Sequence, residues 1–321
     1  MFFKNFMKWM ILLTIMVTLS SSYWFIYWLM MEMNLLMFLP IMNSKKKNNA
    51  NCLVTYFVIQ AFSSTLFFFS SVCFSMLNLF FFEFMIMISI MIKLAVIPFH
   101  FWLTSLSELI NYSSLFMILT LQKIIPLFIL MMNKLEMMVL FALISSIFGS
   151  LLLFNLKSLK KILIFSSISH QGWLMILLAM NSNFWLSYMF IYSLLIYKIS
   201  KIFEKNNFLL TNSFFKKKNS INEKISIATL MLSLGGMPPF TGFMMKFISI
   251  LIIVNNSIYV VMILILSSII NIFIYLRMIN VNLFLNLIFL SKKTFYNYYK
   301  KSALLYMNLF ISIFILNIVM F

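Results

Sequence analysis

Residues 80–102 read FFFEFMIMISIMIKLAVIPFHFW, an apolar run of membrane-spanning length with a lysine, Lys93, near its middle. A transmembrane helix needs about 20 predominantly apolar residues, and this segment meets that requirement. An ionisable side chain at bilayer depth costs from about 3 to over 10 kcal/mol, so such residues are rare and usually functional. The segment therefore predicts both a membrane span and a candidate functional residue.

The remainder of the chain has the same apolar character. Hydrophobic residues make up 64% of the 321 residues and charged residues only 9%, which lies outside the range of soluble globular domains. The apolar runs are continuous and do not alternate, which disfavours a β-barrel. The longest polar stretch covers roughly residues 204–224. We therefore predict an all-α, polytopic membrane protein in which residues 1–321 form a single transmembrane domain.

Eleven candidate spans can be placed on the sequence. The first apolar stretch is divided at residues 20–22, because one helix over residues 9–42 would be about 51 Å long, whereas the hydrocarbon core is about 30 Å thick. The predicted spans are residues 4–20, 23–42, 51–75, 80–103, 113–132, 136–155, 161–180, 184–203, 224–254, 258–277 and 302–321.

The distribution of basic residues supports this count. If the spans alternate, most of the 24 lysine and arginine residues fall in loops on one side of the membrane, whereas Lys134 falls on the other. Basic loops usually face the side from which a membrane protein is inserted, so we attribute the net charge of +18 to topology and not to nucleic acid. The N-terminus is predicted on the positive side and Phe321 on the opposite side. The basic residues on the positive side are Lys4, Lys8, Lys45, Lys46, Lys47, Lys157, Lys160, Lys161, Lys201, Lys205, Lys216, Lys217, Lys218, Lys224, Arg277, Lys292, Lys293, Lys300 and Lys301.

Four charged residues fall near the middle of predicted spans: Glu32, Lys93, Lys123 and Lys246. One structural explanation is a static ion pair that fastens helices together, but a single carboxylate cannot neutralise three lysines. At least one lysine is therefore expected to be neutral for much of the time, because burial disfavours the charged form, and such a lysine can carry protons. Lys198 is different, because it lies close to the end of its span and can extend its ammonium group to the interface.

Helix breaks lie close to three of these charges. They are Pro98 after Lys93, Pro126 after Lys123, and the sequence GGMPP at Gly235–Pro239 before Lys246. A proline inside a helix removes one hydrogen bond and frees the carbonyl four residues earlier. In a bilayer such carbonyls need protein or water as partners, so broken helices tend to line cavities and ion paths. The carbonyls predicted to be free are those of Leu94, Gln122, Leu234 and Gly235.

The two histidines lie in different settings. His170 lies in SSISHQGW, residues 166–173, among hydroxyl groups and an amide that could hold a chain of water molecules. Because histidine titrates near neutral pH, a proton relay is favoured over hydrogen-bonded packing. His100 lies near a span end, where an interfacial anchor and a functional role are equally plausible.

The sequence offers no cofactor site. Cys52 and Cys73 carry no motif, so they are expected to be core residues and not a disulfide or metal site. Two cysteines cannot hold an iron–sulfur cluster, and no strand–GxGxxG–helix unit that could bind a dinucleotide is apparent. Any redox energy must therefore come from partner subunits.

Five stretches together resemble a known family. They are WLMMEMNLLMFLPI around Glu32, KLAVIPFHFW around Lys93, LTLQKIIPLFIL around Lys123, SSISHQGW around His170 and SLGGMPPFTGFMMKF around Lys246. In this order, over about residues 24–247, they resemble the antiporter-like subunit 2 family of mitochondrial NADH:ubiquinone oxidoreductase, respiratory complex I. The loops and the last 70 or so residues match only in general character.

The resemblance implies an antiporter-like fold of eleven helices that lacks the first three helices of the longer versions. It also implies that Glu32, Lys93, Lys123 and Lys246 occupy proton-path positions, with His170 on the same axis. Neighbouring antiporter-like and small membrane-arm subunits, together with lipids such as cardiolipin, would be the partners. NADH, FMN, iron–sulfur clusters and ubiquinone would be bound by other subunits. The location would be the mitochondrial inner membrane, with the N-terminus in the matrix and the C-terminus in the intermembrane space.

A mechanism of proton transfer can be stated for these residues, and its interaction energies are large enough to work against a membrane potential. We hypothesise that Glu32 and Lys93 form a switchable pair, and that protons pass laterally through Lys123 toward Lys246. Two unit charges about 4 Å apart at an effective dielectric near 20 interact by about 4 kcal/mol. Moving one charge against 100 mV costs about 2.3 kcal/mol, which is less than the interaction energy of the pair. Two alternatives stay open: a subunit of a cation/proton antiporter, and a passive membrane scaffold.

Overall fold

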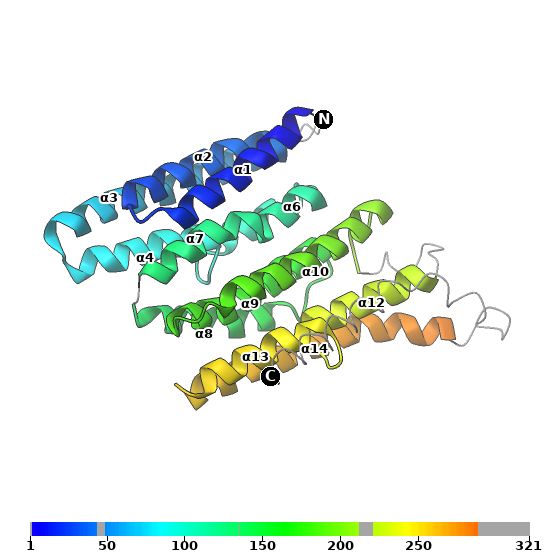
Figure 1. Ribbon diagram of the computed structural model, residues 1–321. Helices are drawn as coiled ribbons and strands as arrows, with labels where there is room; N and C mark the ends of the chain where they lie inside the picture. Colours follow the sequence, from blue (N-terminus) through cyan, green and yellow to red (C-terminus); the bar gives the residue numbers. More distant parts are fainter. Residues whose placement is uncertain (1, 44–48, 134, 212–220, 288–321) are drawn as a thin grey trace.

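The structure is a computed structural model that describes residues 2–43, 49–133, 135–211 and 221–287, and these residues form a bundle of α-helices (Figure 1). Apart from the helices, the described residues contain one isolated antiparallel bridge, between Ser158 and Leu210. The helices are α1 Phe2–Ser20, α2 Trp24–Met42, α3 Asn49–Leu77, α4 Phe80–Leu94, α5 Phe101–Leu106, α6 Tyr112–Leu119, α7 Leu121–Met132, α8 Met137–Leu152, α9 Leu159–Ala179, α10 Phe184–Asn206, α12 Ile221–Gly235, α13 Thr241–Val254 and α14 Ile258–Leu287.

The predicted all-α membrane fold is confirmed. Seven stretches are long and apolar enough to cross a membrane, and α8, α12 and α13 contribute shorter apolar helices. The predicted break after Ser20 separates α1 from α2, and the Tyr27 hydroxyl donates a hydrogen bond of 2.8 Å to the Ser21 carbonyl in that turn. The predicted span 302–321 lies outside the described residues.

Three of the predicted spans are interrupted, as expected for discontinuous helices. The span predicted at 80–103 is divided into α4 and α5, with Ala95 in the left-handed conformation at the end of α4. The span at 113–132 is divided into α6 and α7 at Thr120, whose backbone leaves the helical region. The break predicted at Pro126 is wrong, because α7 continues through this proline. The span at 224–254 is divided into α12 and α13, and Gly236 has a φ of 88° at the break.

Helix α9 lies at the centre of the bundle. In its most apolar window, 94% of the residues are buried, against 22% in α1. In Figure 1, α9 and α10 run between α1–α4 on one side and α12–α14 on the other. Glycines let α8 approach α9 closely, because a Cβ atom at Gly172 would lie 2.7 Å from the Ala142 carbonyl oxygen. The side chains of α9 therefore face other helices on all sides.

Several basic segments meet at one end of the bundle. The beginning of α1, the beginning of α12 and the ends of α10 and α14 lie at this end (Figure 1). Lys4 Nζ donates a 3.0 Å hydrogen bond to the Asn43 carbonyl, and Lys161 forms an ion pair with Glu108. The hydrogen bond and charge of Lys161 hold the pKa of the exposed Glu108 carboxyl below its usual value. The side of the membrane that this end faces remains a prediction.

The packing of α13 on α12 depends on a glycine. A Cβ atom at Gly242 would lie 1.5 Å from the Ser233 carbonyl oxygen, which is backbone and cannot move aside. We therefore expect Gly242→Ala to destabilise the protein by more than about 3 kcal/mol and to reduce strongly the amount recovered from membranes. Gly235→Ala is the control, because its Cβ would first meet a side-chain atom, Tyr275 Cδ2, at 3.1 Å. Equal recovery of both variants, measured after detergent extraction, would contradict this account of the packing.

Candidate functional site

Lys123 lies in the first turn of α7, directly after the break at Thr120. Its side chain is 4% exposed, and Nζ donates a 3.1 Å hydrogen bond to Ser167 Oγ on α9. No carboxylate lies within ion-pair distance of Nζ among the residues that the structure describes. Lys123 is therefore one of the buried lysines without an acidic partner, and Lys93 and Lys246 likewise form no ion pair with a described residue.

Glu32 and Lys93 do not contact each other directly. Glu32 on α2 accepts a hydrogen bond from the Ser64 hydroxyl on α3. Lys93, in the last turn of α4, donates a 3.3 Å hydrogen bond to the carbonyl of Gln60, which lies on α3 one turn before Ser64. Glu32 still interacts electrostatically with Lys93. One turn of α3 thus separates the two members of the predicted pair.

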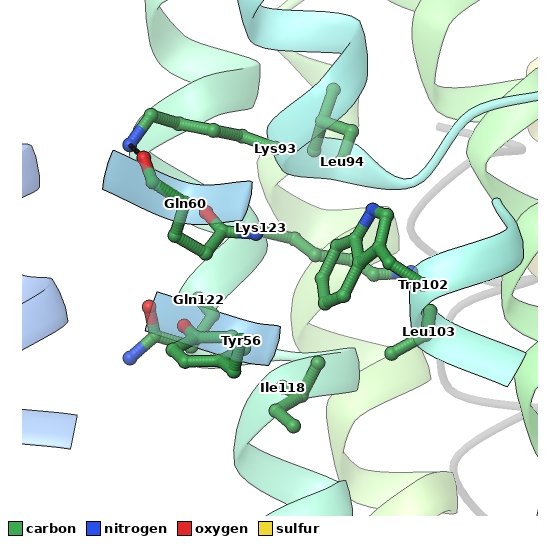
Figure 2. Close-up of a pocket in the computed structure, with 9 residues that line it drawn as sticks. All are labelled: Tyr56, Gln60, Lys93, Leu94, Trp102, Leu103, Ile118, Gln122 and Lys123. Carbon is green, nitrogen blue, oxygen red and sulfur yellow. Dashed lines mark hydrogen bonds between the residues drawn. The ribbon is translucent and has the colours of Figure 1, made fainter. Parts of the chain in front are cut away.

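A small cavity joins Lys93 to Lys123. Figure 2 shows the Lys93 ammonium group reaching the backbone of Gln60, with Lys123 among the residues that line the same space. Gln122 also lines it, and its Nε2 donates a 3.0 Å hydrogen bond to Asn34 Oδ1 on α2. About 10 Å³ is available to the centre of a water molecule. This is close to the minimum for one ordered water with polar partners on several sides.

His170 and Lys246 lie farther along α9 and α13. His170 is 2% exposed, and its Nδ1 lies 2.7 Å from the Tyr188 hydroxyl on α10. The 4% exposed Lys246 donates a 2.6 Å hydrogen bond to the Gly235 carbonyl, and its Nζ lies 6.0 Å from the centre of the Trp173 ring. Trp173 lies on α9 three residues after His170, so Lys246 lies close to the helix that carries His170.

Polar side chains donate hydrogen bonds to carbonyls that the helix breaks leave free. Gln171 Nε2 donates a 2.9 Å hydrogen bond to the Leu94 carbonyl at the break after α4. Lys246 does the same for the Gly235 carbonyl. Two of the four carbonyls predicted to be free, those of Leu94 and Gly235, thus have donors inside the protein. One of the donors, Lys246, is a residue that the sequence assigns to the proton path.

Several residues around α9 were not singled out from the sequence. Ser64, Ser167 and Tyr188 contact the candidate proton-path residues directly. The sequence signal for Ser167, His170 and Gln171 is their spacing, because His170 and Gln171 follow Ser167 by three and four residues and so share one face of α9. Several buried polar atoms in the described part of the chain also lack a hydrogen-bond partner. They include Gln171 Oε1, Asn271 Oδ1 and the hydroxyl oxygens of Tyr192 and Tyr275.

The remaining candidates lie away from this group. His100 is 7% exposed and packs on the Phe101 and Phe165 rings, with centroid distances of 4.3 and 5.8 Å. Lys198 is half-buried on α10. Cys52 and Cys73 are both free thiols, and Cys52 is buried.

The chain matches a known family over most of its length. Residues 21–271 match the family model described as NADH:quinone oxidoreductase/Mrp antiporter, TM. The chain belongs to this family. It is also 44% identical to the NADH-ubiquinone oxidoreductase chain 2 of Rhipicephalus sanguineus over 257 residues, which cover 80% of this chain and 82% of the relative. The corresponding protein of Anopheles gambiae is 34% identical over 253 residues, which cover 75% and 74% of the two chains.

Solved structures show the antiporter-like fold as well. A chain of respiratory complex I from Thermus thermophilus with bound aureothin superposes with a TM-score of 0.79 at 18% identity, covering 87% of this chain and 70% of that chain. A chain of the Mrp complex from Dietzia sp. DQ12-45-1b superposes with a TM-score of 0.71 at 16% identity, covering 84% and 58%. The five stretches discussed above, from Glu32 to Lys246, all lie inside the region that the family model matches.

The hydrogen bond from Gln171 to Leu94 is expected to stabilise the break in α4. Gln171→Leu leaves a buried carbonyl without a donor, which costs about 1–3 kcal/mol. We therefore expect a lower thermal midpoint for the purified assembly that contains this variant. Asn256→Leu is the control, because Asn256 is exposed and donates only to Met180 Sδ. Identical midpoints for the two variants would exclude this role of Gln171.

Proposed function

We propose that this chain translocates protons as a membrane-arm subunit of NADH:ubiquinone oxidoreductase. We further propose that the protons pass through Glu32, Lys93, Lys123, His170 and Lys246. Membership of the antiporter-like family supports the general function. The observation that carries the residue assignments is that each of these residues makes a buried polar contact with a neighbouring helix, and that the Lys246 ammonium group lies 6.0 Å from the Trp173 ring on α9.

The order of the residues follows from these contacts. Glu32 and Lys93 lie on either side of one turn of α3, and Lys93 shares a water-sized cavity with Lys123. Lys123 is hydrogen-bonded to α9, on which His170 lies one turn farther along. Trp173, three residues after His170 on the same helix, has its ring centre 6.0 Å from Lys246 Nζ. We therefore order the groups from Glu32 through Lys93, Lys123 and His170 to Lys246.

The energies of these groups suit work against a membrane potential. Forming or breaking a close ion pair changes the energy of a lysine charge by about 4 kcal/mol at an effective dielectric near 20. This exceeds the roughly 2.3 kcal/mol needed to move one charge against 100 mV. A Glu32–Lys93 pair that opens and closes could therefore load and release protons on this path.

The redox reaction belongs to other subunits in this proposal. In the described part of the chain, no group of three or more His, Cys, Asp or Glu residues could hold a metal ion. We assign NADH, FMN, the iron–sulfur clusters and ubiquinone to partner subunits, and we expect neighbouring membrane-arm subunits to contact this chain. We place the protein in the mitochondrial inner membrane, with the N-terminus in the matrix. Cardiolipin or another anionic lipid suits the basic end of the bundle.

A cation/proton antiporter subunit is the second candidate, and the likeness to the Mrp complex supports it. The two functions differ in the activity that accompanies the protein. A subunit of the oxidoreductase should copurify with rotenone-sensitive NADH oxidation through native fractionation. An antiporter subunit should separate from that activity and retain cation/proton exchange.

The proton path is tested by Lys123→Met. Methionine occupies a similar volume to lysine but carries no proton, so we expect fewer translocated protons per electron and slower turnover. The measurement is the proton-to-electron ratio of the assembled complex in proteoliposomes, normalised to the amount of complex. Lys198→Met is the matched control, since Lys198 lies near the end of α10 and outside the path. An unchanged ratio in Lys123→Met would exclude Lys123 from the path and would favour a passive scaffold.

A further inference from the structure

Helix α3 contributes polar groups to both members of the Glu32–Lys93 pair. Gln60 and Ser64 lie four residues apart, so they share one face of the helix. Ser64 is 0% exposed and its hydroxyl contacts Glu32 Oε1, whereas the Gln60 carbonyl accepts from Lys93. The two charges are thus each bound to α3 and not to each other.

The Ser64 hydroxyl has two acceptors within reach. Besides Glu32 Oε1, its Oγ lies 2.8 Å from the Ala61 carbonyl oxygen of its own helix. A hydroxyl group has one hydrogen and can donate to only one of these acceptors at a time. A charged carboxylate is the stronger acceptor, so it takes this hydrogen whenever Glu32 is ionised and close to α3.

The same arrangement allows the Glu32 carboxylate to move away without leaving the Ser64 hydroxyl unpaired. When the carboxylate moves away, the hydroxyl returns to Ala61, as other buried serines in this helix do with the carbonyl three residues earlier. No buried donor is then left without a partner, which would otherwise cost free energy. The Lys93 side is similar, because the Gln60 carbonyl also accepts a 2.8 Å hydrogen bond from Ser63.

We propose that Ser64 is a positioning residue that holds the Glu32 carboxylate on α3 and thereby keeps the Glu32–Lys93 pair open. In the closed state, Glu32 leaves Ser64 and pairs with Lys93, and the Ser64 hydroxyl donates to Ala61. This inference rests on the proposed roles of Glu32 and Lys93 in proton transfer. It adds the group that competes with Lys93 for the carboxylate.

The size of the effect follows from the strength of the hydrogen bond. A hydrogen bond to a charged group shifts an equilibrium by about 10- to 100-fold. Without Ser64, the closed pair should therefore gain population by about this factor relative to the open state. Because proton transfer requires the pair to open and close in each cycle, a pair held closed slows turnover.

The test compares variants of α3 in the assembled complex. We expect Ser64→Ala to lower the rate of NADH-dependent quinone reduction about 10-fold, which is the lower end of the expected shift in the equilibrium between open and closed pair. Ser64→Thr keeps the hydroxyl and should restore most of the rate. Ser71→Ala is the matched control, because Ser71 is 2% exposed and its hydroxyl donates only to Phe68 of its own helix. All rates are normalised to the amount of complex on native gels.

A second comparison separates positioning from a general packing effect. In a Glu32→Gln background the ion pair cannot form, so adding Ser64→Ala should lower the rate no further. A purely structural role would give the same loss in both backgrounds. The inference is overturned if Ser64→Ala behaves like Ser71→Ala, or if its loss is equal with and without the Glu32 carboxylate. If Glu32→Gln alone leaves the rate unchanged, the proposed role of Glu32 fails instead.

Discussion

The interior of a bilayer supplies no hydrogen-bond partners, and this constraint governs the arrangement of the polar groups in this protein. Every carbonyl freed at a helix break and every buried charge must be satisfied by another part of the bundle. The carbonyls of Leu94 and Gly235 meet this requirement through Gln171 on α9 and Lys246 on α13. The helix breaks and the ionisable residues therefore depend on the same buried hydrogen bonds.

Helix α9 connects the parts of that system. Ser167 binds Lys123, the Trp173 ring lies close to Lys246, and Gln171 binds the carbonyl at the break after α4. A helix with this many polar side chains can lie only at the centre of the bundle, which is where the structure places it. Its neighbours Tyr192 and Tyr275 bring buried hydroxyl groups without protein partners, and these are suitable positions for bound water.

The charges, the breaks and the span-length apolar runs could be read from the sequence because they contrast sharply with an apolar background. The break at Thr120 could not be placed, since neither proline nor glycine marks that residue. Ser64 could not be distinguished either, because it is one of many serines in the helix and differs only through its contact with Glu32 on α2. The separation of Glu32 from Lys93 by α3 likewise depends on helix packing, which the spacing along the chain does not contain.

The central claim is that buried lysines joined through α9 carry protons, and Lys246 tests it most directly because it lies at the far end of the connected groups. The decisive measurement is the number of protons translocated per electron by the reconstituted complex that contains Lys246→Met. Our account predicts a lower ratio than in the unsubstituted complex at equal amounts of assembled protein. A ratio equal to that of the unsubstituted complex would contradict it.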